Sequence, residues 1–138
     1  MGIRHEWADE EQIVMNIYIE FPWTWEEFNH MITVVMPIVR DTNHPCATTV
    51  NCSQLRRFPK DGNVLQTLLN VEKALPENVF ASVVIAAPYM VSMFMNMLMK
   101  LRPRAKRLAL FTQTAEEAQD IIYARYHELY SANTDQAS

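Results

Sequence analysis

The chain contains only two glycines, Gly2 and Gly62, and this scarcity limits the phosphate chemistry that it could perform. Domains of the α/β class usually cradle phosphates in glycine-rich turns between a strand and a helix, because only a residue without a Cβ atom lets the backbone approach the oxygens closely. Neither a GxGxxG motif nor a GxxxxGKS or GxxxxGKT motif occurs in the sequence. We therefore expect neither a nucleotide site nor another bound cofactor.

Few residues suited to acid–base catalysis occur where a ligand would bind. Open α/β sheets bind ligands beyond the carboxyl ends of their strands, and the segments predicted there are 22–23, 53–63, 88–89 and 112–114. These segments contain no histidine, so Asp61 would have to act with Tyr89 or Ser53. This set of residues offers no evident nucleophile paired with a general base. The sequence therefore predicts a protein that is not an enzyme, with a hydrolase that uses Asp61 and Tyr89 as an alternative.

Asp41 and His44 occur together in a segment that also contains Asn43 and Pro45. This segment lies at the opposite end of the predicted sheet. Because asparagine, aspartate and proline are common turn residues, we interpret the segment as a solvated turn and not as a site.

The cysteines and histidines do not follow a metal-binding pattern. No CxxC occurs, and the four histidines are scattered along the chain: His5, His30, His44 and His127. We therefore expect no metal site. Cys46 and Cys52 are six residues apart on one predicted strand, where about 3.3 Å per residue places their Cα atoms beyond disulfide reach. Two free thiols fit a reducing cytoplasm.

The composition is that of a single globular domain. The 138 residues are 49% apolar and 20% charged, and the formal net charge is -4, which gives no general attraction for nucleic acid. The most apolar run, 88–99, is shorter than the roughly 20 residues that cross a bilayer. Residues 1–11 are too polar for a cleavable leader. We expect a cytoplasmic protein that does not insert into membranes.

Strand and helix patterns alternate along the chain. Apolar residues at every second position of 12–21 are typical of a strand, whereas Thr24 and Thr114, each followed three residues later by a glutamate, form capping boxes that begin helices. Asp61 or Asn63 could cap a helix over 64–75, and Pro37 should kink or end the first helix. The expected order is strand 3–7, strand 12–21, a helix from 25 to about 39, strand 46–52, helix 64–75, strand 79–87, a helix from 88, strand 108–111 and a helix from 115 to about 130.

This alternation fixes the expected fold class. Strands that alternate with helices are mostly parallel and are joined by right-handed crossovers, and the opening hairpin adds an antiparallel edge. The prediction is one α/β domain over 1–130, with a mixed, mostly parallel sheet and about four helices, followed by a disordered polar tail over 131–138.

The order of elements resembles the STAS domain, the fold of bacterial anti-sigma factor antagonists and of the cytoplasmic portion of sulfate transporters. The resemblance covers about residues 3–129 and is carried by Thr24-Trp25-Glu26-Glu27-Phe28, Thr49-Val50-Asn51-Cys52-Ser53, Pro76-Glu77-Asn78-Val79 and Thr114-Ala115-Glu116-Glu117-Ala118. It implies a regulatory protein that changes partners when a kinase phosphorylates a serine or threonine at the start of the second helix.

The turn that corresponds to this phosphorylation site departs from the family pattern. It reads Asp61-Gly62-Asn63 and contains no hydroxyl residue. The nearest hydroxyls, Ser53 and Thr67, lie well before the turn and one turn inside the helix. Because no kinase can switch a carboxylate, we expect a protein that is either constitutive or regulated elsewhere.

The predicted third helix is the strongest candidate for an interaction surface. Its apolar residues are Tyr89, Met90, Met93, Phe94, Met95, Met97, Leu98, Met99 and Leu101, and they surround a thin polar strip of Ser92, Asn96 and Lys100. One face of a sheet can cover only part of such a helix, and flexible thioethers suit adaptable contacts. We expect the remaining surface, with Met90, Met93 and Met97, to bind a protein partner or a second copy in a homodimer. Complete burial by neighbouring helices is the alternative.

A basic segment follows this helix: Lys100, Arg102, Arg104, Lys106 and Arg107. Such a run is usually a solvated loop, but it could also receive an acidic partner, such as residues 6–11 of a second copy. Aromatic residues are not interleaved with these bases and no recognition-helix pattern follows, so we expect no nucleic acid. We include Lys100, Arg102 and Arg104 in the predicted interaction surface.

Trp23 and Trp25 flank a strand end where ligands commonly bind. We expect Trp25 in the core and Trp23 partly exposed, with Trp23 and Tyr89 beside a small apolar pocket. Taken together, the residues predict a non-catalytic regulatory or scaffold module. The alternative is a carrier that holds a small apolar or lipid-like ligand between the first and third helices.

Overall fold

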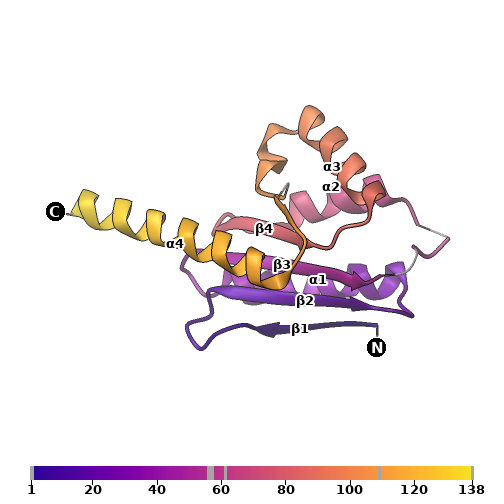
Figure 1. Ribbon diagram of the computed structural model, residues 1–138, viewed down its shortest axis with the longest axis horizontal. Helices are drawn as coiled ribbons and strands as arrows, with labels where there is room; N and C mark the ends of the chain where they lie inside the picture. Colours follow the sequence, from indigo (N-terminus) through magenta and orange to yellow (C-terminus); the bar gives the residue numbers. More distant parts are fainter. Residues whose placement is uncertain (1, 56–57, 61, 109, 138) are drawn as a thin grey trace.

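The computed structural model describes residues 2–55, 58–60, 62–108 and 110–137, with only the backbone at 104, 107, 108 and 130–137. The elements within these residues follow the predicted order (Figure 1): β1 (Ile3–Trp7), β2 (Val14–Glu20), α1 (Trp25–Arg40), β3 (Cys46–Gln54), α2 (Val64–Ala74), β4 (Val79–Ile85), α3 (Tyr89–Leu101), the 3₁₀ helix η1 (Pro103–Leu108), β5 (Leu110–Thr112) and α4 (Ala115–Ala137).

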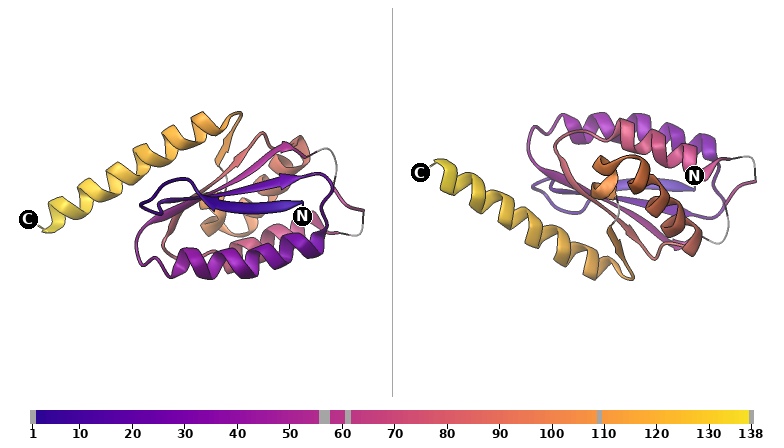
Figure 2. Two further views of the ribbon diagram at one scale, coloured as in Figure 1. Left: turned by 90° about the horizontal axis from the view of Figure 1, so that it is seen from below. Right: turned by 90° about the horizontal axis from the view of Figure 1, so that it is seen from above.

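The strands form one mixed sheet in the order β1-β2-β3-β4-β5. β1 is antiparallel to β2, and the pairs from β2 to β5 are parallel. This arrangement confirms the predicted α/β fold with a mixed, mostly parallel sheet. From β2 to β5 each new strand is added at the same edge of the growing sheet. Crossovers of one hand that all run in this direction place their helices on one face. As a result α1, α2 and α3 lie on one face of the sheet and α4 lies on the other (Figure 2).

The sheet separates two apolar clusters. The larger cluster, between the sheet and the first three helices, includes Met15, Ile17, Val35, Met95 and Leu98. The smaller cluster, between the sheet and α4, includes Val14, Ala81, Val83, Ala118 and Ile122. Successive side chains of a strand point to opposite faces, so Val14 and Met15 of β2 enter different clusters.

Side-chain caps begin three of the helices. Thr24 Oγ1 and Thr114 Oγ1 accept hydrogen bonds from the amides three residues later, at 3.0 Å and 3.2 Å, as the capping boxes predict. Asn63 Oδ1 accepts in the same way at 3.0 Å and caps α2. Asp61, the other predicted cap of this helix, lies outside the described residues.

Two helices run past their predicted ends. α1 continues through Pro37 to Arg40, because a proline in the last turn removes only one backbone hydrogen bond. α4 continues to Ala137, beyond the end expected near residue 130. It includes most of the segment 131–138 that the sequence predicted to be a disordered tail, and this end of α4 projects beyond the sheet (Figure 1).

Several strand ends also differ from the predicted ones, and β2 spans Val14–Glu20 instead of 12–21. β3 continues to Gln54, and β5 begins at Leu110 because η1 takes up the preceding basic segment. β4 ends at Ile85, since Ala86 adopts a left-handed φ of 55° that interrupts the extended backbone.

Candidate functional site

A small apolar cavity lies at the carboxyl ends of the parallel strands, on the face that carries three helices. Its volume is about 90 Å³. The strands contribute Ile19, Val50, Cys52, Ser82 and Val84; the helices contribute Trp25, Phe28, Val64, Thr67, Leu68, Val71, Val91 and Met95; the connections contribute Trp23, Leu55 and Phe58. This is the end of the sheet where open α/β domains bind ligands.

Strand and helix periodicity explain why these side chains meet. Val50 and Cys52 are two residues apart on β3, so both point to the same face of the sheet. On α3, Val91 and Met95 are four residues apart and both are buried. These residues form part of the cavity wall, together with the large side chains of the tryptophans and phenylalanines.

The two hydroxyl groups in this wall already have partners within the chain. Thr67 Oγ1 donates to the carbonyl oxygen of Asn63 at 2.9 Å. Ser82 Oγ accepts from Thr48 Oγ1 at 2.7 Å. The cavity is therefore apolar in character, although two of its residues are polar.

The exposure of the two tryptophans is the reverse of the predicted one. Trp23 is buried, with 6% of its surface exposed, whereas Trp25 is half-buried. Trp23 lies inside an aromatic cluster, with ring centroids 4.9 Å from Trp25, 6.2 Å from Phe28 and 6.1 Å from Phe58. Trp25 is the first residue of α1 and lies at the rim, where its Nε1 donates to the carbonyl oxygen of Pro59 at 2.9 Å. The predicted exposure of Trp23 was wrong, but both rings line the cavity.

The turn before α2 positions this aromatic cluster. A Cβ atom built on Gly62 would lie 1.8 Å from Trp25 Nε1. Gly62 does not have a left-handed φ, so the turn needs glycine for space and not for its conformational freedom. Asn63 is the cap of α2, and Asp61 lies outside the described residues. Gly62 thus packs against Trp25, one of the rings that line the cavity.

Cys52 contributes a neutral thiol to the cavity wall. Burial raises the pKa of this thiol from 9.0 to about 12. Because the thiolate is the nucleophilic form of cysteine, Cys52 acts as an apolar wall group at neutral pH. Cys46 and Cys52 are both free and buried, which confirms that they do not form a disulfide.

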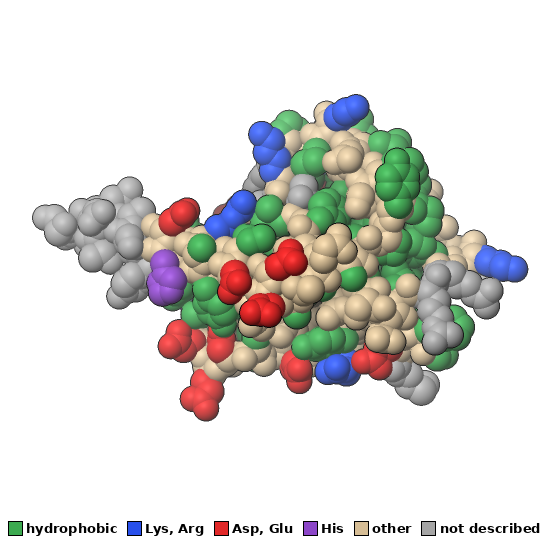
Figure 3. Space-filling view, in the orientation of Figure 1, with side chains coloured by type: hydrophobic (Ala, Val, Ile, Leu, Met, Phe, Trp, Pro, Cys, Tyr) green, Lys and Arg blue, Asp and Glu red, His purple; other side chains and the backbone are tan. Residues whose placement is uncertain are grey.

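An exposed apolar surface follows the outer face of α3. Tyr89, Met93, Met97 and Leu101 are four residues apart and are 83%, 42%, 44% and 67% exposed, and Met90 beside them is 38% exposed. We call these five residues the α3 stripe. Hydrophobic side chains gather over this part of the molecule in Figure 3. The alternative prediction, that neighbouring helices bury α3 completely, was therefore wrong. The prediction that Tyr89 lies beside the apolar pocket was also wrong, because Tyr89 belongs to this stripe and does not line the cavity.

The basic segment at the end of α3 is only partly free. Lys100 and Lys106 are exposed, but Arg102 Nε lies 2.7 Å from Glu72 Oε2. The contact is an ion pair and not an aligned hydrogen bond. Glu72 is buried on α2, so Arg102 neutralises an internal charge in addition to any role at the surface. The side chain of Arg104 lies outside the described residues.

Glu72 is a structural residue that our sequence analysis missed. It lies four residues after Leu68, which belongs to the inward face of α2, so helical periodicity alone would have placed it there. A buried carboxylate requires a cation nearby, and the basic segment offered candidates.

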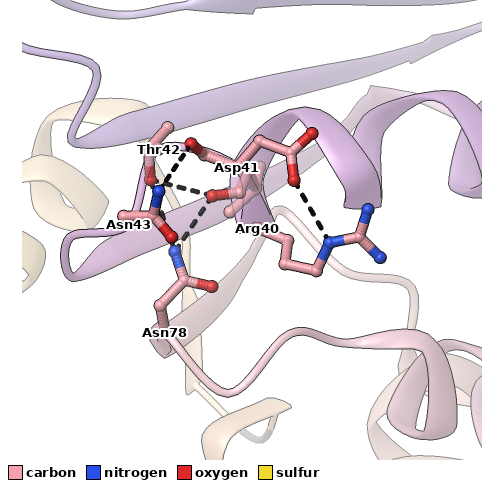
Figure 4. A network of polar contacts seen from close by, with 6 residues as sticks. Arg40, Asp41, Thr42, Asn43 and Asn78 are labelled. Carbon is pink, nitrogen blue, oxygen red and sulfur yellow. Dashed lines mark hydrogen bonds and ion pairs between the residues drawn. The ribbon is translucent and has the colours of Figure 1, made fainter.

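A network of hydrogen bonds connects the end of α1 to the segments that precede β3 and β4, at the opposite end of the sheet (Figure 4). Asn78 Nδ2 donates to the carbonyl oxygens of Val39 and His44, each at 2.9 Å. Asp41 is exposed and pairs with its neighbour Arg40 at 3.3 Å. The arrangement is that of a structural turn, as the residue types in this segment indicated.

One thiol–imidazole contact occurs beside this turn. Cys46 Sγ lies 3.6 Å from His44 Nδ1 and donates to the carbonyl oxygen of Gln12 at 3.4 Å. Cys46 is fully buried, and this burial raises the pKa of its thiol. A buried neutral thiol is a poor nucleophile, so the geometry does not favour a catalytic pair.

In the part of the chain that the structure describes, no cluster of three or more potential ligands could hold a metal ion, and no helix is long and apolar enough to cross a membrane. No family model matches the chain, and no curated protein or solved structure is significantly similar to it.

Proposed function

We propose that this chain is a non-catalytic regulatory or scaffold module that binds a protein partner, with a second copy of itself as the first candidate. The observation that supports this function is the α3 stripe. Large apolar side chains scattered singly over a surface are ordinary, but five on one face of a helix indicate a contact site. A role in binding a protein partner would make the chain similar to anti-sigma factor antagonists. Its second helix, however, begins without the hydroxyl residue whose phosphorylation regulates those proteins.

The size of the stripe predicts the strength of the contact. α3 has 13 residues and is thus about 20 Å long. A stable interface buries roughly 800 Å² on each partner, which is more than one helix face of this length supplies. We therefore expect weak, concentration-dependent association that also involves neighbouring residues of α2 and η1.

Charge around the stripe favours an acidic partner surface. Neither α3 nor η1 contains an acidic residue, and Lys100 and Lys106 are exposed at this end of the molecule. Acidic side chains gather in the opposite half of the view in Figure 3. Opposite charges on two surfaces accelerate their encounter in a salt-dependent way, and the exposed residues Glu6, Glu10 and Glu11 of a second copy provide such a surface.

Light scattering over a range of protein concentrations tests this function. The wild-type mass should rise above the 16.1 kDa of one chain as concentration increases. A variant with Met93→Asp and Met97→Asp should stay at the mass of one chain, because two charges would be desolvated at the contact. Asn96→Asp is the control, since it places one such charge on the same helix but outside the stripe.

Two results would count against this proposal. A wild-type chain that stays at the mass of one copy at every concentration contradicts self-association. A Met93→Asp and Met97→Asp variant that associates as strongly as Asn96→Asp shows that the α3 stripe is not the interface. Thermal unfolding of each variant verifies that the fold is intact.

The cavity favours a second function, that of a carrier for a small apolar ligand. The alternative prediction placed the ligand between the first and third helices, whereas the cavity is lined by α2 as well as by α1 and α3, and its wall is apolar. A cavity of ~150 Å³ in another protein accommodates benzene, and this cavity has a volume of about 90 Å³. A molecule of a few heavy atoms matches this volume, and a lipid chain exceeds it. Native mass spectrometry of the purified protein tests for such a ligand.

A further inference from the structure

β1 is an edge strand with an unpaired outer side. Within the described sheet it pairs with β2 alone. The left view of Figure 2 looks onto this edge and shows no other described element in front of it. The free side of an edge strand is a template for another strand, unless its side chains oppose pairing. The residues of β1 therefore decide which strand this edge accepts.

The hydrogen bonds to β2 show which backbone groups of β1 point outward. Glu20 N donates to the carbonyl oxygen of Gly2 at 2.6 Å, and Ala8 N donates to that of Val14 at 2.8 Å. In an antiparallel pair, residues that bond to the neighbouring strand alternate with residues whose N–H and C=O groups face away from it. Since Gly2 and Ala8 bond to β2, the outward-facing residues are Ile3, His5 and Trp7.

These three residues define one antiparallel register for a second copy of β1. When His5 lies opposite His5 of the other copy, Ile3 lies opposite Trp7, and all three outward residues are paired. A shift of two residues in either direction leaves only two such pairs. Each pair exchanges two backbone hydrogen bonds, so the register centred on His5 makes the largest number of bonds.

The charged residues of β1 make this register complementary. It places Arg4 of each copy directly opposite Glu6 of the other. Both side chains are more than half exposed. Arg4 contacts Glu6 of its own strand at 3.7 Å and Glu20 at 3.2 Å, and a guanidinium has five N–H donors, which leaves donors for a further carboxylate. Opposite charges across two strands stabilise the pair, and like charges destabilise it. A second copy of β1 therefore fits this edge.

Exposed apolar residues of α1 lie beside the same edge. Glu27 Oε2 accepts from Gly2 N at 3.0 Å, so this side of α1 faces β1. Val34 and Ile38 follow Glu27 at helical spacing, and both are exposed. α1 runs in the general direction of β1, because it returns the chain between the parallel strands β2 and β3. The rise from Glu27 to Val34 and that from Gly2 to His5 are each about 10 Å, so Val34 lies level with His5.

We infer that β1 pairs with β1 of a second copy in this antiparallel register, with the two-fold axis at His5, so that the two sheets join into one. The exposed Val34 side chains then lie near the same axis. This surface is separate from the α3 stripe, and the inference goes beyond the proposed function. A pair of five-residue strands mainly exchanges hydrogen bonds to water for bonds between the copies, with a small net gain. We expect it to be weaker than the contact of the α3 stripe and to require about 1 mM protein.

The variant with Met93→Asp and Met97→Asp is the background for the test, because contact through the α3 stripe is weakened in it. Spectra of ¹⁵N-labelled protein are recorded at increasing concentrations up to about 1 mM. The amide signals of Ile3, His5 and Trp7 should shift as concentration rises. Signals at these residues that do not change would overturn the inference.

Reversal of the charges tests the register. In Arg4→Glu protein and in Glu6→Arg protein, like charges face each other at both positions, so each variant alone should pair at least about tenfold more weakly than the background. A mixture of the two variants restores opposite charges at both positions and should pair as the background does. Arg125→Glu is the matched control for Arg4→Glu, because it makes the same change of charge at an exposed position of α4. It should leave pairing unchanged.

His5→Pro tests the role of the backbone. It removes an outward-facing N–H, and an edge strand tolerates proline at such a position. The variant should lose pairing and keep its fold, which thermal unfolding verifies. Pairing that survives in folded His5→Pro protein overturns the inference. So does a mixture of the charge variants that pairs no better than either variant alone, and this mixture decides the question if His5→Pro does not fold. The function proposed for the α3 stripe is tested separately, with β1 unchanged.

Discussion

At the scale of single residues, the candidate site depends on how closely the backbone approaches aromatic rings. The scarcity of glycine led us to expect no phosphate cradle, and Gly62 has a different use. Its missing side chain leaves room for the Trp25 indole, and a Cβ atom there would overlap the ring. Steric room of this kind leaves no pattern in the sequence, because the two residues are far apart along the chain.

Gly62→Ala should therefore destabilise the protein. A methyl group within 1.8–2.2 Å of three Trp25 ring atoms forces the ring or the turn to move, and overpacking of this kind costs about 1–3 kcal/mol. Chemical denaturation measures the loss. In a Trp25→Leu background, where the ring is absent, the same substitution should cost less than half as much. An equal cost in both backgrounds would contradict the steric explanation.

At the scale of elements, α4 packs on its face of the sheet through a small apolar cluster, and Tyr123 adds a polar contact. Ala118 and Ile122 pack against the sheet. Tyr123 Oη donates to Asp9 Oδ2 in the turn between β1 and β2. Burial, and then the hydrogen bond and charge of Asp9, raise the pKa of Tyr123 from 10.0 to about 12. The folded state thus favours the protonated phenol.

Tyr123→Phe should lower the free energy of unfolding by about 1–2 kcal/mol, because it removes one charge-assisted hydrogen bond to Asp9, which keeps the hydrogen bond from the amide of Ile13. The pKa of Tyr123 is higher in the folded state than in the unfolded state. Its contribution is therefore complete below pH 10 and is lost as the pH rises from 10.0 to about 12. Denaturation at several pH values measures this loss, which should be smaller in Tyr123→Phe. An equal loss in both proteins would show that other groups cause it.

The elements were predictable where local chemistry decides them. The capping residues Thr24 and Thr114 and the alternation along β2 are local signals, and each placed its element correctly. The cavity was not predictable in the same way. It arises because side chains from three strands and three helices leave a gap, and the inward turn of Trp23 depends on packing against residues distant in sequence.

At the scale of the whole molecule, buried and exposed methionines are clearly separated. Met15 and Met95 are each 1% exposed, whereas Met93 and Met97 are 42% and 44% exposed. The sequence placed the exposed methionines on a candidate surface, because one sheet face can cover only one side of a helix. The sequence also indicated which side stays uncovered, since Met90, Met93 and Met97 were expected there and are exposed. The strand order brings α1, α2 and α3 to one face, and Met95 is buried on the opposite side of α3.

Limited oxidation with hydrogen peroxide should reveal this separation. At low protein concentration, Met93 and Met97 should form sulfoxides at least about tenfold faster than Met15 and Met95, because oxidation follows exposure. Peptide mass mapping measures each rate. At high concentration the rates at Met93 and Met97 should fall if two copies cover the stripe. Equal rates for Met93 and Met95 at low concentration would contradict the described burial of α3.

The inner side of α3 lines the cavity with Val91 and Met95, and its outer side carries the stripe. Because a helix moves as a rigid body, a tilt of α3 displaces its inner and outer sides together. An occupant that shifts α3 would therefore alter how well a partner docks, and thermodynamic reciprocity requires the partner to alter the occupant's affinity by the same factor. Occupancy of the cavity would then regulate partner binding in a chain whose residues 61–63 offer a kinase no hydroxyl to phosphorylate.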